Sequence, residues 1–583
     1  MKKLAALVLF ALPLFPFPAA AAAPRPFLDL DLEAPECSSG WWDFANGPYD
    51  VLMDRSQVRS GRQSIVVRYT GQTPWTEAKR WQGAFEQDFP ASLAAGKKLH
   101  FSAYIKTEEV TAGEAVLWVL AFAFDGSVVG AAGTDGRGAV GTAPWTRYEI
   151  DFTVPAGATD IAFGGQLAGN GAAWFDGFGL EISGRPWRET LPKFPPPSPQ
   201  AVSWLRSRAI PVATVEAENG FADLEPLKKL IGDARVVSLG EQTHGTREFF
   251  QMKHRLVEFL ASEMGFTIFA IEANMPESYR VNDYILSGKG DPKELLKGMY
   301  FWTWNTQEVL DMIEWMRRFN ESGRGRILFT GFDMQYSPVA SGIVREFLGK
   351  ADSQFAPEGG RLLDRVDAAS RRFSATAEDV AAARQVFEHL ESGREAYLAR
   401  FPHDEVEWAI QNSRITVQNM EEITGATARD ESMAKNVEWI LDQAPPGAKI
   451  VLWAHNGHVS RSPGAMGGHL AQRFGKQMVV LGFAFDQGRY NAVGGEVGLS
   501  DWEALPPAVN AVESYLNAAG IPRFVLDLRR VPAGAPAAWL AQPRPFREIG
   551  ALASRCSSVR TVVDDLFDGL IWIDQTSPSV LLR

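Results

Sequence analysis

The chain has 583 residues, more than a single hydrophobic core accommodates, so we expect two or three domains. Its content of 46% hydrophobic and 22% charged residues is typical of a globular protein. The formal net charge of −12 argues against a nucleic-acid backbone as partner. We therefore expect no nucleic-acid binding.

The first residues have the pattern of a secretory signal. Lys2 and Lys3 form a short basic stretch, an apolar segment runs from Leu4 to Phe15, and small residues fill positions 19–23. The apolar segment is short and interrupted by proline, which disfavours a membrane span, and no later segment qualifies. We expect residues 1–23 to be a signal peptide and the protein to be exported, either periplasmic or secreted, with a mature charge of −12 − 2 = −14.

The chain has two cysteines, Cys37 and Cys556. In an oxidising compartment they could pair and tie the first domain to the last strands. The sequence leaves equally open that they are two unrelated thiols, because it does not give their separation. Two cysteines so far apart make no metal motif.

Residues 26–184 have the pattern of an all-β domain. Apolar and polar residues alternate between turns rich in Gly, Pro and Asp, in segments 64–70, 99–106, 115–124, 147–154 and 173–182. We predict a jelly-roll-like β-sandwich. Its closing segment resembles the last strand of carbohydrate-binding jelly rolls, and Trp41, Trp42, Trp75 and Trp81 could stack on sugar rings or pack in the core. A glycan is therefore one candidate partner of this domain.

Residues 185–200 form a proline-rich linker, and residues 201–583 have the texture of an α/β domain. Apolar strands are expected at 235–239, 267–274, 326–333, 449–456, 478–485, 523–528 and 569–574. Continuous apolar strands separated by helices indicate a mainly parallel central sheet covered on both faces. Between about 337 and 445 the pattern is helical throughout, which predicts a helical lobe inserted at the sheet's C-terminal edge.

Acidic and imidazole side chains recur where the predicted strands end. These residues are Glu241 with His244, Glu272, Asp333, and His455 with His458. Because the carboxyl ends of parallel strands meet at one edge of a sheet, we expect these side chains to converge. A single acid at a strand end is more often a core or capping residue, but repetition over strands distant in sequence favours a site.

The sequence narrows the chemistry of this site. It contains no G-x-S-x-G elbow and no G-x-x-x-x-G-K-[ST] loop, and neither cysteine follows a strand, so an activated water is the expected nucleophile. A histidine oriented by a carboxylate can deprotonate water without a metal or cofactor, and we favour this interpretation. Two alternatives stay open: zinc held by His455 and His458 with Glu241, Glu272 or His244, and a non-catalytic glycan-binding protein.

Three segments together resemble the erythromycin esterase family: Gly240-Glu-Gln-Thr-His-Gly245, Phe269-Ala-Ile-Glu272 and Ala454-His-Asn-Gly-His458. The resemblance covers roughly residues 205 to 583 and includes Trp302-Thr-Trp304 and Arg429-Asp-Glu-Ser-Met-Ala434. It implies a carboxylic ester hydrolase in which activated water opens an ester or lactone. It also implies that His244 is the general base, that Glu241 and Glu272 support it, and that His455 and His458 position or polarise the substrate.

The chain departs from the macrolide-resistance members of that family, which are cytoplasmic and lack a β-domain. We therefore expect a small-molecule or glycosylated ester other than a macrolide as substrate, and a role in the response to antibiotics stays open. Arg429 could bind the substrate or form a structural ion pair. Trp302 and Trp304 could wall a substrate cleft or pack in the core.

Overall fold

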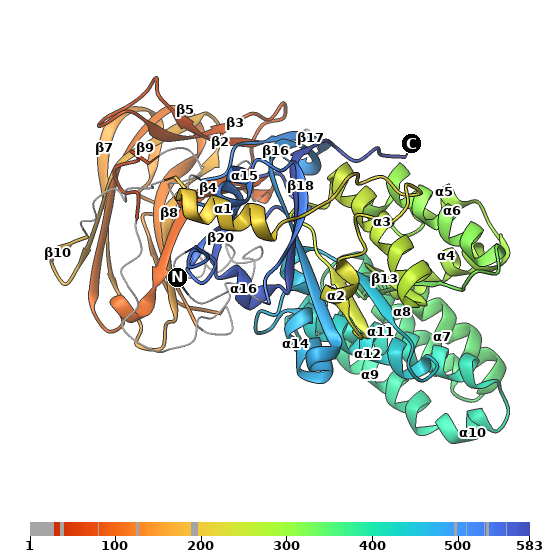
Figure 1. Cartoon of the computed structure of the whole chain (residues 1–583). Helices are drawn as coiled ribbons and strands as arrows, with labels where there is room; N and C mark the ends of the chain where they lie inside the picture. Colours follow the sequence, from red (N-terminus) through yellow and green to blue (C-terminus); the bar gives the residue numbers. More distant parts are fainter. Residues whose placement is uncertain are drawn as a thin grey trace.

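The computed structural model describes residues 28–34, 40–79, 81–123, 127–187, 196–494, 498–508, 510–529, 531, 534, 536–554 and 557–582. The predicted signal peptide, both cysteines and residues 188–195 of the predicted linker lie outside these ranges. Figure 1 shows a β-rich N-terminal part, red to orange, beside an α/β part coloured yellow to blue.

The N-terminal part is an antiparallel sheet of ten strands in the order β1-β4-β8-β5-β9-β3-β2, with β6 and β7 paired to β5 and β10 to β9. The strands are β1 (Trp42–Asn46), β2 (Tyr49–Asp54), β3 (Ser64–Tyr69), β4 (Gln82–Pro90), β5 (Lys98–Phe122), β6 (Val128–Gly133), β7 (Ala139–Thr153), β8 (Asp160–Gly169), β9 (Ala172–Ile182) and β10 (Arg185–Pro186). The prediction of an all-β N-terminal region is confirmed.

Strand β5 explains why these strands form one sheet rather than the two separate sheets of a simple sandwich. The segments 99–106 and 115–124, which we predicted as two strands, both belong to its 25 residues up to Phe122. Its first half pairs with β9 and β7, and its second half pairs with β8 and β6. The sheet therefore curls around one core that includes Phe85, Phe101 and Phe163.

The second part contains a mixed sheet in the order β11-β18-β21-β16-β12-β15-β13-β14, with β17 paired to β16. Its strands are β11 (Ile210–Pro211), β12 (Val236–Leu239), β13 (Ile268–Asn274), β14 (Leu328–Asp333), β15 (Ile450–Trp453), β16 (Met478–Gly494), β17 (Gly498–Ala504), β18 (Arg523–Asp527) and β21 (Gly569–Thr576). From β21 to β14 neighbouring strands are parallel. Strand β18 is antiparallel to β21, β11 to β18, and β17 to β16.

Helices cover both faces of this sheet. They include α1 (Pro199–Arg208), α2 (Leu227–Ile231), α3 (Arg247–Met264), α4 (Met275–Ser287), α5 (Pro292–Lys297), α6 (Gln307–Glu321), α13 (Asn456–Val459), α14 (Met466–Phe474), α15 (Val512–Ala518) and α16 (Val563–Leu566). Alternate residues of β13 enter different cores: Phe269 joins the core that contains α3 and α6, and Ile268 the core that contains α14. A small antiparallel ribbon, β19 (Arg544–Arg547) with β20 (Ser558–Thr561), lies apart from the sheet.

Six helices fill the chain between β14 and β15, where we predicted a helical lobe. They are α7 (Pro338–Ala351), α8 (Ala356–Arg371), α9 (Ala377–Ser392), α10 (Arg394–Leu398), α11 (His403–Thr424) and α12 (Arg429–Gln443). Helices α7 to α11 share a core of their own that includes Val344, Phe347 and Ile410. Figure 1 shows these helices, in green and cyan, grouped at one end of the sheet. Among the described residues, no helix has the length and apolarity to cross a bilayer.

Candidate active site

The turn between β12 and α3 carries the first two predicted residues, Glu241 and His244. Two glycines let this turn pack closely on its neighbours. A Cβ atom at Gly240 would collide with the side chain of Asn456, and one at Gly245 with the backbone of Asn491. The buried strand Val236–Leu239 thus delivers a carboxylate and an imidazole to the C-terminal edge of the sheet.

Glu241 and His244 form a hydrogen-bonded pair. Nδ1 of His244 lies 2.7 Å from Oε1 of Glu241, and the Glu241 carboxylate is fully buried. Among the described residues, none hydrogen-bonds to Nε2 of His244. The carboxylate therefore fixes the ring through one nitrogen and leaves the other nitrogen free to act on a water molecule.

Lys253 is a member of this group that the sequence reasoning missed. It lies on α3 and is fully buried, and its Nζ donates to Oε2 of Glu241 at 2.6 Å. The Trp453 indole donates to the same oxygen at 2.9 Å. Burial acts to raise the pKa of Glu241, but Lys253 and His244 outweigh it and hold that pKa below its ordinary value. Burial lowers the pKa of Lys253 to about 8.

Glu272, at the end of β13, joins the sheet to the helical lobe. Its Oε1 accepts from Arg429 Nη2 at 2.8 Å, and its Oε2 accepts from the backbone N–H of His455 at 2.9 Å. Arg429 also donates to both oxygens of Asp333, at 3.1 and 2.6 Å. Burial opposes ionisation of Glu272, but the positive charges around it hold its pKa well below the ordinary range. Arg429 is therefore bound to two strand ends at once.

His458 forms a second histidine–carboxylate pair with Asp430, the residue after Arg429. Nδ1 of His458 lies 2.9 and 3.0 Å from the two Asp430 oxygens. Its Nε2 lies 3.3 Å from Oε1 of Glu272 and 3.1 Å from Nη1 of Arg429. Burial lowers the pKa of His458, but Asp430 and Glu272 outweigh it and raise this pKa to about 9. His458 is therefore positively charged at neutral pH.

His455 has both ring nitrogens engaged by the protein. Nε2 lies 3.1 Å from the carbonyl oxygen of Ile549, and Nδ1 accepts from the N–H of Gly457 at 3.3 Å. Glu548 also lies 3.3 Å from Nδ1, and it contributes to a raised pKa of His455 against the effect of burial. These contacts suit a positioning role better than proton transfer.

The structure brings the predicted residues into one cluster. The rings of His244 and His455 have centroids 5.2 Å apart, and Glu272 contacts both His455 and His458. Trp304 is 1% exposed, packs edge-on against His244, and donates its indole N–H to the Glu272 carbonyl at 2.9 Å. Trp304 is thus a buried support of the site.

Trp302 belongs to the same short helix, η4 (Trp302–Trp304), and is half-buried. Within the described part of the chain it forms no hydrogen bond or ring contact with the histidine and carboxylate side chains of the cluster. Its predicted role in substrate binding stays a prediction.

The fit of a metal ion can be judged from the carboxylates. Both oxygens of Glu241 and both of Glu272 already accept hydrogen bonds from Lys253, Trp453, Arg429, His244 or the His455 backbone. Within the described residues, no three His, Cys, Asp or Glu side chains are arranged to hold a metal ion. In this arrangement the carboxylate oxygens are occupied by hydrogen-bond donors of the protein.

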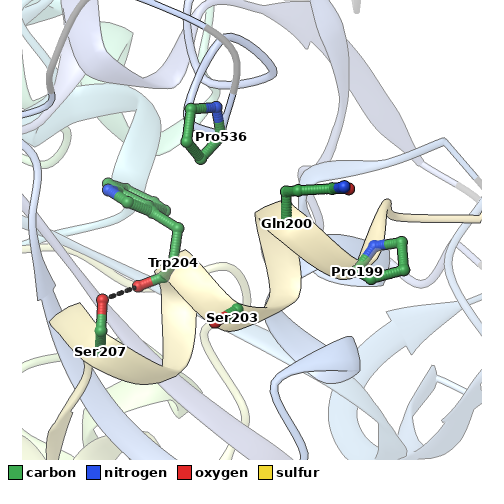
Figure 2. Close-up of a pocket in the computed structure, with 6 residues that line it drawn as sticks. All are labelled: Pro199, Gln200, Ser203, Trp204, Ser207 and Pro536. Carbon is green, nitrogen blue, oxygen red and sulfur yellow. Dashed lines mark hydrogen bonds between the residues drawn. The ribbon is translucent and has the colours of Figure 1, made fainter.

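A shallow open depression of about 470 Å³ lies elsewhere, along α1. Figure 2 shows Trp204 and Gln200 of α1 below Pro536 at this position. None of the histidines and carboxylates described above lines it, so we do not assign it to the site.

Known proteins resemble the second part of the chain in sequence and in fold. Residues 261–576 match the family model described as erythromycin esterase. The chain is 25% identical over 378 residues to erythromycin esterase type II of Escherichia coli, covering 56% of this chain and 89% of that protein. A crystal structure of a Bacillus cereus protein is 27% identical, with a TM-score of 0.60, covering 66% of this chain and 99% of that one. A mutant of the erythromycin esterase EreC, in its open conformation, shares the fold with a TM-score of 0.52 and 18% identity, covering 62% of this chain and 96% of that chain.

Proposed function

This chain belongs to the erythromycin esterase family, and from that premise we propose that it hydrolyses a carboxylic ester or lactone with water activated by His244, without a metal ion. One observation carries the proposal. Nδ1 of His244 is bound to the buried, ionised Glu241, whereas Nε2 has no hydrogen bond to the described residues. A histidine in this state can accept a proton from water.

The proposed reaction begins with water held at Nε2 of His244. The imidazole takes a proton from the water as the water oxygen bonds to the ester carbonyl carbon. Glu241 then faces an imidazolium, and its negative charge stabilises that ion across the 2.7 Å hydrogen bond. Lys253 and Trp453 keep Glu241 ionised and fixed in place.

The oxyanion formed at the carbonyl oxygen needs positive donors. Arg429 Nη1 and His458 Nε2 lie 3.1 Å apart beside Glu272, and both carry positive charge at neutral pH. We assign the stabilisation of the oxyanion to this pair. When the tetrahedral intermediate collapses, the bond to the leaving oxygen breaks and that oxygen takes the proton from His244, which yields an acid and an alcohol.

The test is a panel of esters and lactones that includes macrolides, measured with wild type and His244→Ala. We expect at least one non-macrolide ester to be turned over by wild type, and the variant to be slower by about 10²–10⁴-fold, the usual contribution of a general base. Dialysis against a chelator is expected to leave activity unchanged. Full activity of His244→Ala would refute the mechanism. Stoichiometric zinc lost together with activity would favour the metal-dependent alternative, and failure on the whole panel would favour a binding protein.

We also propose that the protein is exported and that its β-domain binds a glycan. The pattern of residues 1–23 supports export. Of the four tryptophans considered for sugar stacking, Trp41 is buried in the core, whereas the partly exposed Trp42, Trp75 and Trp81 support glycan binding. N-terminal sequencing of the mature protein tests the first, since an intact Met1 contradicts it. A polysaccharide-binding assay of the full chain, with the active site blocked by His244→Ala, tests the second.

A further inference from the structure

Buried polar side chains that the proposed mechanism does not use lie next to Glu272. Glu277, on the first turn of α4, is 2% exposed, and neither of its carboxylate oxygens has a hydrogen-bond partner among the described residues. Asn274, which precedes the same helix, is fully buried and has neither side-chain amide atom paired. Unpaired buried polar groups are costly, so a native protein keeps them for water or a ligand. Because α4 follows β13 directly, these groups lie one turn from the site.

Helix α11 brings unpaired polar groups to the same place from the helical lobe. Gln411, Ile415, Asn419 and Glu422 lie on one face of this helix by their spacing. Gln411 contacts the sulfur of Met275 at the start of α4, and Asp333 raises the pKa of Glu422 in addition to burial. Asn419, between them, is fully buried with both amide atoms unpaired. The lobe and the sheet edge thus face each other with unpaired polar groups.

The chemistry of these side chains favours a ligand that carries hydroxyl groups over a charged ligand. Burial, with a smaller contribution from the neighbouring Asp333, raises the pKa of Glu277 to about 8, so this carboxyl is mainly neutral at pH 7. A protonated carboxyl and a primary amide each offer a donor and an acceptor side by side. A hydroxyl group has the same two capacities, whereas a charged ligand needs an unpaired counter-charge.

An aromatic pair lies beside these polar groups. Tyr300 is 56% exposed, and its ring packs edge-on against Tyr336 with centroids 5.0 Å apart. Tyr336 is three residues beyond Asp333, and Glu277 raises the pKa of Tyr300 in addition to burial. The backbone of Tyr300 has φ +66°, a left-handed conformation that a tyrosine rarely adopts. Strained backbone conformations of this kind are among the features that cluster at ligand sites.

We propose that Asn274, Glu277, Tyr300, Tyr336 and Asn419, named here the ring cluster, recognise a hydroxylated, sugar-like ring of the ester substrate. The exposed face of Tyr300 packs on the apolar face of the ring, and the amides and the Glu277 carboxyl bind its hydroxyls. The cluster adjoins Glu272 and Asp333, which places such a ring beside the ester bond. This inference rests on the proposed function, since it names the substrate class of the same site.

The test compares kcat/KM on two probes, a mono-acetylated methyl glucoside and para-nitrophenyl acetate, and uses their ratio as the measure of ring recognition. Glu277→Gln keeps a neutral donor and acceptor and is expected to keep the ratio, whereas Glu277→Leu is expected to lower it at least about tenfold. Tyr300→Phe keeps the aromatic face and is therefore expected to keep the kcat/KM ratio of the two probes. Tyr300→Gly is expected to lower the ratio without lowering Tm, because glycine tolerates the left-handed backbone.

Leu286→Ala, at the exposed far end of α4, is the matched control and is expected to leave the ratio unchanged. Equal ratios in wild type, Glu277→Leu and Tyr300→Gly would overturn the ring cluster, as would a wild type that does not hydrolyse the acetylated glucoside. If the proposed function holds, His244→Ala lowers kcat/KM on both probes by the same factor. A failure of the ring cluster is therefore distinguishable from a failure of the hydrolase mechanism.

Discussion

Lys253 is the buried cation that keeps Glu241 ionised, and its removal is expected to affect both stability and catalysis. In Lys253→Met the Glu241 carboxylate stays fully buried and keeps only His244 and Trp453 as donors. Removal of one partner of a buried ion pair costs about 3–5 kcal/mol of folding free energy, because the remaining charge is uncompensated. Glu241 is then expected to take up a proton. A neutral carboxyl no longer stabilises the His244 imidazolium, so kcat is expected to fall by about 10²-fold or more.

The assay is urea unfolding together with steady-state kinetics on an ester that wild type hydrolyses. The double variant Glu241→Gln with Lys253→Met removes both charges, so it is expected to be more stable than Lys253→Met alone yet equally slow. Lys228→Met is the matched control, because this lysine pairs with Glu225 and Glu263 at the surface and contributes little. Wild-type stability and wild-type kcat in Lys253→Met would show that Lys253 is not needed to keep Glu241 ionised.

Three further predictions concern charge and packing around the site. The pKa of His458 is raised from 6.5 to about 9, so the stabilisation by this charged histidine is fully present below about pH 6.5 and is lost as pH rises through about 9. In urea unfolding, the stability difference between wild type and His458→Gln is expected to shrink by up to about 3 kcal/mol over this interval. A difference that does not change with pH would contradict this prediction. Asp430→Asn removes the carboxylate that contributes most to the raised pKa of His458, so the alkaline limb of the pH profile of kcat is expected to move from about pH 9 toward neutrality. An alkaline limb that stays at the same pH would exclude His458 as the group that titrates there. Gly245→Ala places a Cβ atom against the backbone of Asn491, which cannot move aside as a side chain can, so thermal unfolding should show a loss of about 1–3 kcal/mol of folding free energy. The control Gly265→Ala places its Cβ in open space and is strained only by the left-handed φ.

Much of the fold was predictable because its signals are local. The seven predicted apolar strands of the central sheet begin within two residues of their predicted positions, although β16 continues to Gly494, beyond the predicted end at 485. The joining of two predicted segments into β5 was not predictable. The polar stretch between them, with Gly113, has the composition of a turn. It is irregular in the structure, with register shifts and positive φ at Glu109 and Gly113, and the pairing of β5 on both sides of it joins the two segments into one strand.

The candidate site was predictable where its residues follow strands and was missed where they come from elsewhere. Lys253 lies four residues after Phe249 and three before Leu256, on the apolar face of α3, and a charged residue on such a face was a signal of burial. Glu548 offers no comparable signal, because it reaches His455 from a loop nearly one hundred positions away. The pairing of Asp430 with His458 likewise depends on how the helical lobe packs on the sheet edge.

Direct attack by water on the ester carbonyl is tested by the source of the oxygen atom that enters the acid product. A single turnover in water enriched with the heavy isotope of oxygen, with enzyme in excess over substrate, is followed by mass spectrometry of the released acid. We expect one labelled oxygen in the acid from this first turnover. Unlabelled acid, with the label appearing instead on a carboxylate of the protein such as Glu272, would contradict it.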